Sequence, residues 1–437
     1  MTEQPTTHDR QPHDREPPDR EPGRRPPQRL STKEAAERLG VKPETLYAYV
    51  SRGLLSSHRL QGRRGSTFDA EEVDALARRG RNVRPATGDE PPATPGAVSL
   101  RTGITLITDD HYYFRGVPAV ELALTRGYEE AAHWLWTGGT RHGVRFTAPE
   151  GALAAADRAV TALPAYSTLT DRLRVAAVAA AAADPLRFDL SPSTVTGAAG
   201  GLIATLVDAL PLAGNRTRRP SGAIARRLWS RLAPQAADDP SISVLQTALV
   251  LLIDHDLAAS TLAARVAASA RAHPYAVVSA ALGTVEGQLH GGASGLAHRM
   301  LSEVLQRGSA APVVSDHLRA GRPVPGLGHR LYAGEDPRAT ALFGLLERVP
   351  RAEPVLAAAR DVVAASARDV PAHANVDLAL AVLSVATGMP AEAGETVFSV
   401  ARTAGWIAHA LEEYAESPLR MRPRGRYDGP MPPQPLP

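Results

Sequence analysis

Hydrophobic and polar positions divide the chain into a polar beginning, a short patterned segment and a long helical region. Residues 1–28 mix proline with charged residues and offer no apolar face, so we expect a disordered tail. The stretch S-T-K-E at residues 31–34 is typical of a capping box before a short helix that Gly40 ends. Pro43 suits the first turn of a second helix, which Gly53 ends.

A hairpin and a third helix follow in the pattern. Residues 54–68 have hairpin character, with Gly62 and Gly65 at the bend, and a helix capped by Asp69 comes next. Two helices, a basic hairpin and a helix predict a small winged helix-turn-helix domain over residues 29–80. Residues 81–97, rich in proline and glycine, indicate a linker.

Beyond the linker, the apolar positions follow one long helical pattern, which a proline-rich, basic stretch interrupts around residues 210–226. Alanine-rich stretches such as residues 152–159 and 175–183 favour close-packed helices over sheets. We therefore expect an all-α domain over residues 98–430 and a short tail over residues 431–437. Apolar runs such as residues 248–253 are far too short to span a bilayer, so no membrane partner is expected.

Composition narrows the possible chemistry. The chain has no cysteine, which excludes disulfides, thiolate metal sites and a cysteine nucleophile. The net charge of +3 is too small to indicate nucleic-acid binding by the chain as a whole. The polar N-terminus lacks the apolar core of a signal peptide, so we expect a cytoplasmic protein.

The N-terminal domain resembles the winged-helix DNA-binding module of the MerR and excisionase families. The V-x-x-x-T-L run of that module stands at residues 41–46 and its G-L-L segment at residues 53–55. Residues 52–68 carry arginines and no acid, as phosphate contacts require. The residues expected to contact duplex DNA are Lys42, Thr45, Tyr47, Arg52, Arg59, Arg63 and Arg64. The alternative is a dimerisation or protein-docking unit, because Tyr47 replaces the arginine usual in the family.

Polar residues that could carry chemistry stand out in the helical region. Taken singly, each has a structural explanation, such as a hydrogen-bonded histidine, a helix cap or an ion-paired arginine. Together, three histidines, one aspartate and three arginines suit proton transfer at carbon beside a polyanionic substrate. These residues are His255, His290, His329, Arg338, Asp377, Arg402 and Arg422.

Other motif interpretations fail on spacing. A P-loop needs a lysine, and none follows Lys42. The stretch G-L-G-H-R-L lacks the third glycine of a dinucleotide-binding turn. The histidines show no H-x-x-x-H spacing, so we expect no metal site, and a serine-hydrolase G-x-S-x-G is absent.

Five motifs in series resemble the citrate synthase family, including its 2-methylcitrate synthase relatives. They are L-H-G-G-A at residues 289–293, G-L-G-H-R-L-Y at 326–332, D-P-R-A at 336–339, N-V-D at 375–377 and A-R-T-A-G-W-I-A-H at 401–409, which R-P-R follows at 422–424. The stretches Y-F-R-G at 113–116 and D-H-D-L-A-A-S-T at 254–261 add to the resemblance. It implies an all-α homodimer with a large and a small subdomain, the small one roughly over residues 291–382.

The resemblance also implies roles for individual residues. Asp377 would remove a proton from the methyl carbon of acetyl-CoA, His290 would stabilise the enol, and His329 would polarise the ketone of oxaloacetate. Oxaloacetate would be bound by His255, His329, Arg338 and Arg402, with Arg422 completing the site of the partner subunit. Coenzyme A, a substrate rather than a cofactor, would contact Leu327, Gly328 and Asn375.

Departures from the family pattern leave alternatives open. Ser294 replaces an asparagine and Gln288 a proline, and residues 378–380 (L-A-L) stand where many members have an aromatic residue or histidine, then serine and glycine. Acetyl-CoA and propionyl-CoA differ by one methylene, which sequence does not separate. A regulator that uses the same fold as a metabolite sensor is the competing hypothesis. The retained Asp377 favours the enzyme, because a sensor needs no base.

Overall fold

The chain forms two compact units, residues 1–99 and residues 100–437. The computed structural model describes residues 29–39, 46, 50, 55–59, 66–70, 72–74, 100–108, 111–287, 290–332, 334–367, 373–423 and 425–434.

Among its described residues, the first unit contains a three-stranded antiparallel sheet and the helix α1. Strand β3 (Ser66–Asp69) pairs with β1 (Arg29–Ser31) on one side and with β2 (Ser57–Arg59) on the other, and helix α1 is Thr32–Leu39. The predicted capping box is confirmed, since the Ser31 backbone N–H donates to Glu34 Oε2 at 2.8 Å and the Glu34 N–H to Ser31 Oγ at 3.3 Å.

A small apolar core explains the sheet. Phe68 of β3 is fully buried with Leu46 and Val73, and Leu30 of β1 lies opposite Phe68 in the register. The pairing of β2 with β3 confirms the predicted hairpin, whereas strand β1 before the first helix was not predicted.

Most of the residues expected to contact DNA lie outside the described residues, namely Lys42, Thr45, Tyr47, Arg52, Arg63 and Arg64. For Arg59, only the position in strand β2 is described.

The second unit begins with three short strands, which the sequence pattern did not predict. Strands β4 (Thr105–Ile107), β5 (Tyr112–Phe114) and β6 (Val117–Pro118) form an antiparallel meander. Tyr112 and Phe114 point into the core while Tyr113 between them is only half-buried, which is the alternation of a strand. The prediction of a helical pattern that begins directly after the linker is therefore wrong for this segment.

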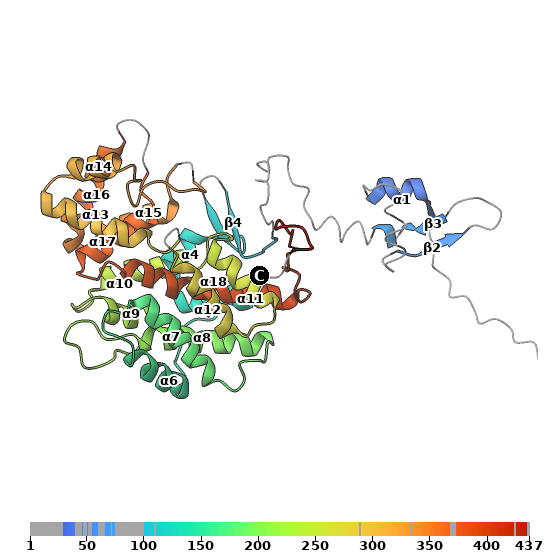
Figure 1. The fold of residues 1–437 in the computed structure, drawn as a ribbon, viewed down its shortest axis with the longest axis horizontal. Helices are drawn as coiled ribbons and strands as arrows, with labels where there is room; N and C mark the ends of the chain where they lie inside the picture. The colour runs from blue at the N-terminus through green and yellow to red at the C-terminus, as the bar shows by residue number, and fades with distance from the viewer. Residues whose placement is uncertain are drawn as a thin grey trace, which may run out of the picture. The chain divides into compact units, whose positions relative to one another are not determined.

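The remainder of the second unit is helical, which confirms the predicted fold class (Figure 1). The helices are α4 (Ala119–Thr125), α5 (Tyr128–Thr137), α6 (Glu150–Thr161), α7 (Leu169–Ala182), α8 (Pro192–Ala209), α9 (Ile224–Leu232), α10 (Asp239–Leu251), α11 (Ala259–Ser269), α12 (Pro274–Val285), α13 (Ala293–Arg307), α14 (Ala310–Arg319), α15 (Pro337–Leu346), η1 (Pro350–Ala352), α16 (Glu353–Ser366), α17 (Val376–Ala386) and α18 (Ala393–Ala415). Figure 1 shows α13 to α17 grouped on one side and α6 to α12 on the other.

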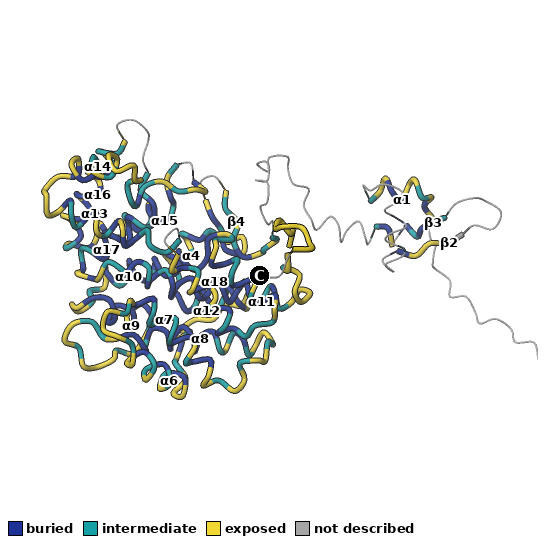
Figure 2. Tube along the Cα trace, viewed as in Figure 1, coloured by how far each residue is buried: buried dark blue, intermediate teal, exposed yellow. Residues whose placement is uncertain are grey.

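Helix α18 forms the centre of the second unit. It packs against α8, α11 and α12, and most of its residues are buried (Figure 2). At Gly405 a Cβ atom would lie 2.1 Å from the carbonyl oxygen of Ile253, so only glycine lets the helix pass this close to the segment after α10. This approach brings Arg402 beside residues 252–255. In the part of the chain that is described, no helix could cross a membrane.

Candidate active site

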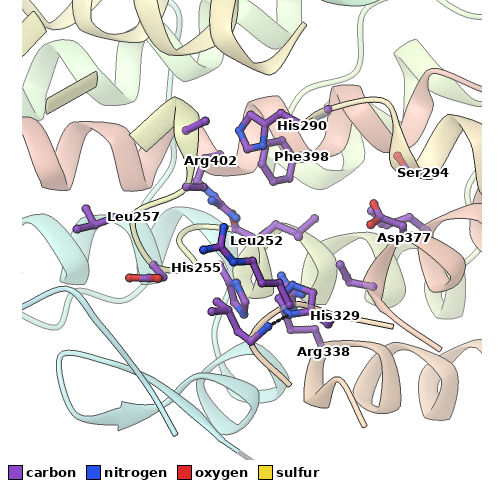
Figure 3. Close-up of a pocket in the computed structure, with 18 of the residues that line it drawn as sticks. Leu252, His255, Leu257, His290, Ser294, His329, Arg338, Asp377, Phe398 and Arg402 are labelled. Carbon is purple, nitrogen blue, oxygen red and sulfur yellow. Dashed lines mark hydrogen bonds between the residues drawn. The ribbon is translucent and has the colours of Figure 1, made fainter. Parts of the chain in front are cut away.

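A cavity of about 590 Å³ brings six predicted site residues together (Figure 3). They come from the segment after α10, the turns before α13 and α15, and the helices α15, α17 and α18. The six residues are His255, His290, His329, Arg338, Asp377 and Arg402.

His255 is a buried residue of the cavity wall, and an unusual backbone turn follows it in the chain. The residue after it, Asp256, has a φ of 60°, which is uncommon for a residue with a side chain. The His255 Nε2 atom lies 2.7 Å from the hydroxyl of Tyr332. Burial, and then the positive charges of Arg338 and Arg402, lower the pKa of His255 well below its usual value. The ring is therefore neutral at physiological pH.

His329 is placed by two glycines. Gly326 and Gly328 have φ values of 82° and 74°, and a Cβ atom on Gly326 would lie 2.8 Å from the Cβ of Leu378. The turn therefore lies directly against α17. The His329 Nδ1 atom accepts a hydrogen bond of 3.1 Å from the Leu331 backbone N–H. Since burial and Arg338 lower the pKa of His329 to about 4, the ring is neutral and its proton is on Nε2.

The turn is also tied to the segment before α17. The Gly328 N–H donates to the His373 carbonyl at 2.8 Å, and Asn375 Nδ2 donates to the Gly328 carbonyl at 2.9 Å. Leu327, Gly328 and Asn375 are not among the residues that line the cavity. Their predicted contact with coenzyme A stays a prediction.

Arg338 is held by Asp336, a partner that the sequence analysis missed. Asp336 Oδ1 accepts from the Arg338 Nε at 2.9 Å and Asp336 Oδ2 from its Nη2 at 2.8 Å, and both side chains are buried. Asp336 also caps α15 and accepts a 3.0 Å hydrogen bond from the Val376 N–H. The available signal was an aspartate before Pro337, at the expected cap of a helix.

Arg402 presents its guanidinium from the buried centre of α18. Its Nε donates to the Leu252 carbonyl at 2.8 Å, and the group lies 4.6 Å from the centre of the Phe398 ring. Burial lowers the pKa of Arg402 to about 10, so the group remains a cation at neutral pH. Its two Nη atoms are left for a ligand, because no described residue accepts from them.

Asp377 lies in the first turn of α17, where Asn375 accepts from its backbone N–H at 3.0 Å. Within the described residues, the Asp377 carboxylate itself accepts no hydrogen bond. Burial raises the pKa of Asp377 to about 6; Arg338 lowers it and Asp336 raises it further. A carboxylate with this pKa is a suitable general base near neutral pH.

His290 completes the set. Its Nε2 atom lies 2.7 Å from the Ser260 hydroxyl, another contact that the sequence analysis missed. Burial and then Arg402 lower the pKa of His290, so this ring too is neutral at physiological pH. Besides the exposed Asp256 and Arg330, the cavity thus combines three neutral imidazoles, two buried guanidinium groups and one carboxylate whose pKa is raised by burial. This set can bind a small dianion and abstract a proton from carbon.

Arg422 does not line this cavity. It lies in the exposed segment after α18, where its backbone N–H donates to the Leu419 carbonyl at 3.0 Å. Its predicted role in the cavity of a partner subunit stays a prediction. Among the described residues, no group of histidine and carboxylate side chains could hold a metal ion.

Two known protein families match this chain, one for each of its two units. The family model of the citrate synthase C-terminal domain matches residues 94–424, and a helix-turn-helix domain model matches residues 29–81. A putative citrate synthase 2 of Mycobacterium tuberculosis H37Rv is 38 % identical over 207 residues, which cover 46 % of this chain and 55 % of the relative. The citrate synthase of Haloferax volcanii is 38 % identical over 190 residues, covering 42 % and 49 %. The chain spans about half the length of the curated relatives it matches.

Solved structures extend the similarity to 78 % of this chain. The crystal structure of citrate synthase from Thermotoga maritima has a TM-score of 0.63 and 27 % identity, covering 78 % of this chain and 96 % of that one. A citrate synthase from Thermoplasma acidophilum, in complex with carboxymethyl coenzyme A and oxaloacetate, has a TM-score of 0.64 at 23 % identity, covering 78 % and 97 %. The second likeness establishes the fold alone.

Proposed function

Because the chain belongs to the citrate synthase family, we propose that it condenses a short acyl-CoA with oxaloacetate and water to give a citrate-type tricarboxylate and coenzyme A. The observation that carries this proposal is the cavity itself, in which a desolvated Asp377 faces neutral histidines and two arginines. A sensor of oxaloacetate would need the arginines but no base with a pKa of about 6.

The first step is proton abstraction. Asp377 takes a proton from the carbon next to the thioester carbonyl, and His290 donates a hydrogen bond to the oxygen that becomes the enol. A thioester α-proton is weakly acidic, so the base succeeds only if this oxygen is stabilised as charge develops, in a site that excludes water. For His290 to donate through Nδ1, its Nε2 must accept from the Ser260 hydroxyl at 2.7 Å, which the geometry allows.

Carbon–carbon bond formation follows. The enol carbon attacks the ketone carbon of oxaloacetate, and the ketone oxygen accepts a hydrogen bond from His329 Nε2–H. Arg338 has one guanidinium edge on Asp336 and Arg402 has its Nε on the Leu252 carbonyl, which leaves Nη atoms of both for the substrate carboxylates. Water then hydrolyses the new thioester, which releases coenzyme A.

Purified protein tests the enzyme directly. Release of coenzyme A should be measured from acetyl-CoA and from propionyl-CoA, each with oxaloacetate. Release from either supports the synthase. Tight oxaloacetate binding without release from either would instead favour the metabolite sensor.

The acyl preference depends on the wall beside Asp377. Ser294 and Leu380 line the cavity there, and a Cβ atom on Gly394 would lie 2.4 Å from Ser294 Oγ, so Ser294 fills a slot between α13 and α18. A serine leaves more room next to the base than the asparagine usual in the family. This observation keeps propionyl-CoA, and hence 2-methylcitrate synthase activity, as the second candidate.

We further propose a homodimer in which Arg422 completes the site of the partner subunit. Two inactive variants test this, Asp377→Asn and Arg422→Ala, unfolded and refolded together. In a mixed dimer, one cavity would combine an intact Asp377 with an intact Arg422 from the other chain, so activity should return. If Arg422 acts within its own chain, mixing restores nothing.

For the first unit we propose binding to duplex DNA. The support is the helix-turn-helix family match and the basic composition of residues 52–68. Fluorescence anisotropy with the full chain and promoter DNA beside its own gene should show binding that weakens steeply with salt. The double variant Arg63→Gln, Arg64→Gln should weaken it, and no binding at low salt contradicts the proposal and favours a docking or dimerisation unit.

A further inference from the structure

Tyr332 contacts a substrate-binding histidine from behind the cavity. It is buried, with 3 % of its surface exposed, and it is absent from the cavity wall. Its hydroxyl lies 2.7 Å from His255 Nε2, although the two residues are 77 positions apart in the chain. Its ring centre also lies 5.0 Å from that of His329. Tyr332 therefore joins the two segments that carry His255 and His329.

The direction of the hydrogen bond decides which ring nitrogen of His255 carries the proton. His255 is neutral, so it has one N–H and one free lone pair. Burial raises the pKa of Tyr332 well above its usual value, so its hydroxyl keeps its proton. A phenol is a better donor than a neutral imidazole N–H, and an imidazole nitrogen is a better acceptor than a phenol oxygen. The favoured arrangement is Tyr332 O–H donating to Nε2, which leaves the His255 proton on Nδ1.

The groups around His255 give this tautomer a function. The rings of Tyr112, His329 and Tyr332 pack against it, and the Tyr112 hydroxyl is occupied by the Leu251 carbonyl at 3.2 Å. Arg338 and Arg402, whose charges act on His255, only donate hydrogen bonds and cannot accept one from it. Among the described residues, Nδ1 has no partner, so an anionic ligand in the cavity is the acceptor open to an Nδ1–H group.

We infer that Tyr332 is a positioning residue that holds His255 as its Nδ1–H tautomer, and so adds a third donor to Arg338 and Arg402 for a small dicarboxylate. The opposite tautomer would point a lone pair at the ligand and repel it. The identity of the dicarboxylate rests on the proposed function, whereas the tautomer does not.

The test compares two tyrosine-to-phenylalanine variants of the full-length protein. Tyr332→Phe keeps the ring and removes the donor to His255. Tyr112→Phe is the matched control, because it also removes a buried hydroxyl from a ring that packs on His255, but one that is bonded elsewhere. We expect Tyr332→Phe to raise the KM and the calorimetric Kd for oxaloacetate about three- to tenfold, the range of one hydrogen bond. The kcat at saturating oxaloacetate should change less than about twofold, and Tyr112→Phe should leave all three constants near the wild-type values.

Nuclear magnetic resonance of protein labelled with ¹⁵N-histidine gives a second readout that packing alone would not move. The His255 signals are assigned by their loss in His255→Asn. In the wild type we expect a protonated Nδ1 and an unprotonated Nε2, and in Tyr332→Phe a mixture or the reverse. A proton on Nε2 in the wild type, or an unchanged tautomer in Tyr332→Phe, overturns the inference even if KM rises. If the protein binds no oxaloacetate, the proposed function fails, and the ring spectra still decide the role of Tyr332.

Discussion

The two sides of the cavity differ in how firmly their polar groups are held. The arginine side is formed by His255, His329, Arg338 and Arg402. Each of these four side chains makes a hydrogen bond to another group of the protein. The aspartate side, formed by Ser294, Asp377 and Leu380, contains a carboxylate without a hydrogen-bond partner among the described residues. In Figure 3, Asp377 and Ser294 lie together on the right, whereas the arginine side occupies the centre.

This difference matches two different tasks. A site that binds a dianion benefits from donors fixed in advance, because they need not reorganise when the ligand arrives. A base benefits from the opposite condition, since a carboxylate stabilised by donors would be too weak to take a proton from carbon. Desolvation of Asp377 therefore costs stability and increases basicity at the same position.

The largest expected effect comes from the aspartate side. Asp377→Asn should lower kcat by about 10²- to 10⁴-fold, because it removes the proposed base, while KM for oxaloacetate should change only a few-fold. The melting temperature should stay the same or rise, since a desolvated carboxylate is lost. Steady-state coenzyme A release and thermal unfolding check both parts. Asp256→Asn, at the same cavity but exposed, is the control, and retention of most of the activity by Asp377→Asn contradicts the assignment.

On the arginine side, Arg338→Gln should lower both stability and the affinity for oxaloacetate. It leaves Asp336 buried without its cation, which should cost about 3–5 kcal/mol in the free energy of unfolding and abolish tight oxaloacetate binding. Urea unfolding and calorimetry measure the two effects. Arg330→Gln, at an exposed cavity residue, should change stability by less than about 0.5 kcal/mol. Equal stability losses in the two variants would refute the comparison.

In the wild-type protein, kcat and oxaloacetate binding should depend differently on pH, because kcat depends on the aspartate side and binding on the arginine side. Asp377, the proposed base, can take a proton only when it is ionised, so kcat should fall as the pH drops below about 6, by roughly tenfold per pH unit, and should level off above it. The arginines stay charged throughout, with Arg402 having the lower pKa of about 10. The dissociation constant for oxaloacetate should therefore vary little between about pH 5 and 8. A kcat that stays constant down to about pH 4.5 would be incompatible with Asp377 as the base.

The smallest expected effect concerns acyl choice. Ser294→Asn should shift the ratio of kcat/KM values towards acetyl-CoA by about tenfold, within the range for one methylene. Because Ser294 packs closely on Gly394, a second variant, Ser294→Ala, adds no atoms and should keep the ratio within about twofold. Parallel assays with acetyl-CoA and propionyl-CoA measure both ratios. An unchanged ratio in Ser294→Asn would remove Ser294 from the acyl site.

Part of the fold followed from local pattern, and part did not. The capping box at Ser31, the β2–β3 hairpin and the helical second unit were predicted, because each depends on residues close together in the chain. Strands β1 and β4 to β6 were missed. They are only two to three residues long, too short for alternation to show, and their pairing partners give them their structure.

The sequence by itself determined which side chains can do chemistry, since the motifs around His290, His329 and Asp377 contain those residues whatever their environment. Only the tertiary structure decided how they behave. Asp336, Tyr332 and Ser260 became partners through contacts made by packing, and the pKa of Asp377 rose to about 6 because the folded chain packs around it. Residue type is local information, whereas desolvation, hydrogen-bond direction and tautomer depend on groups that meet only when distant segments pack together.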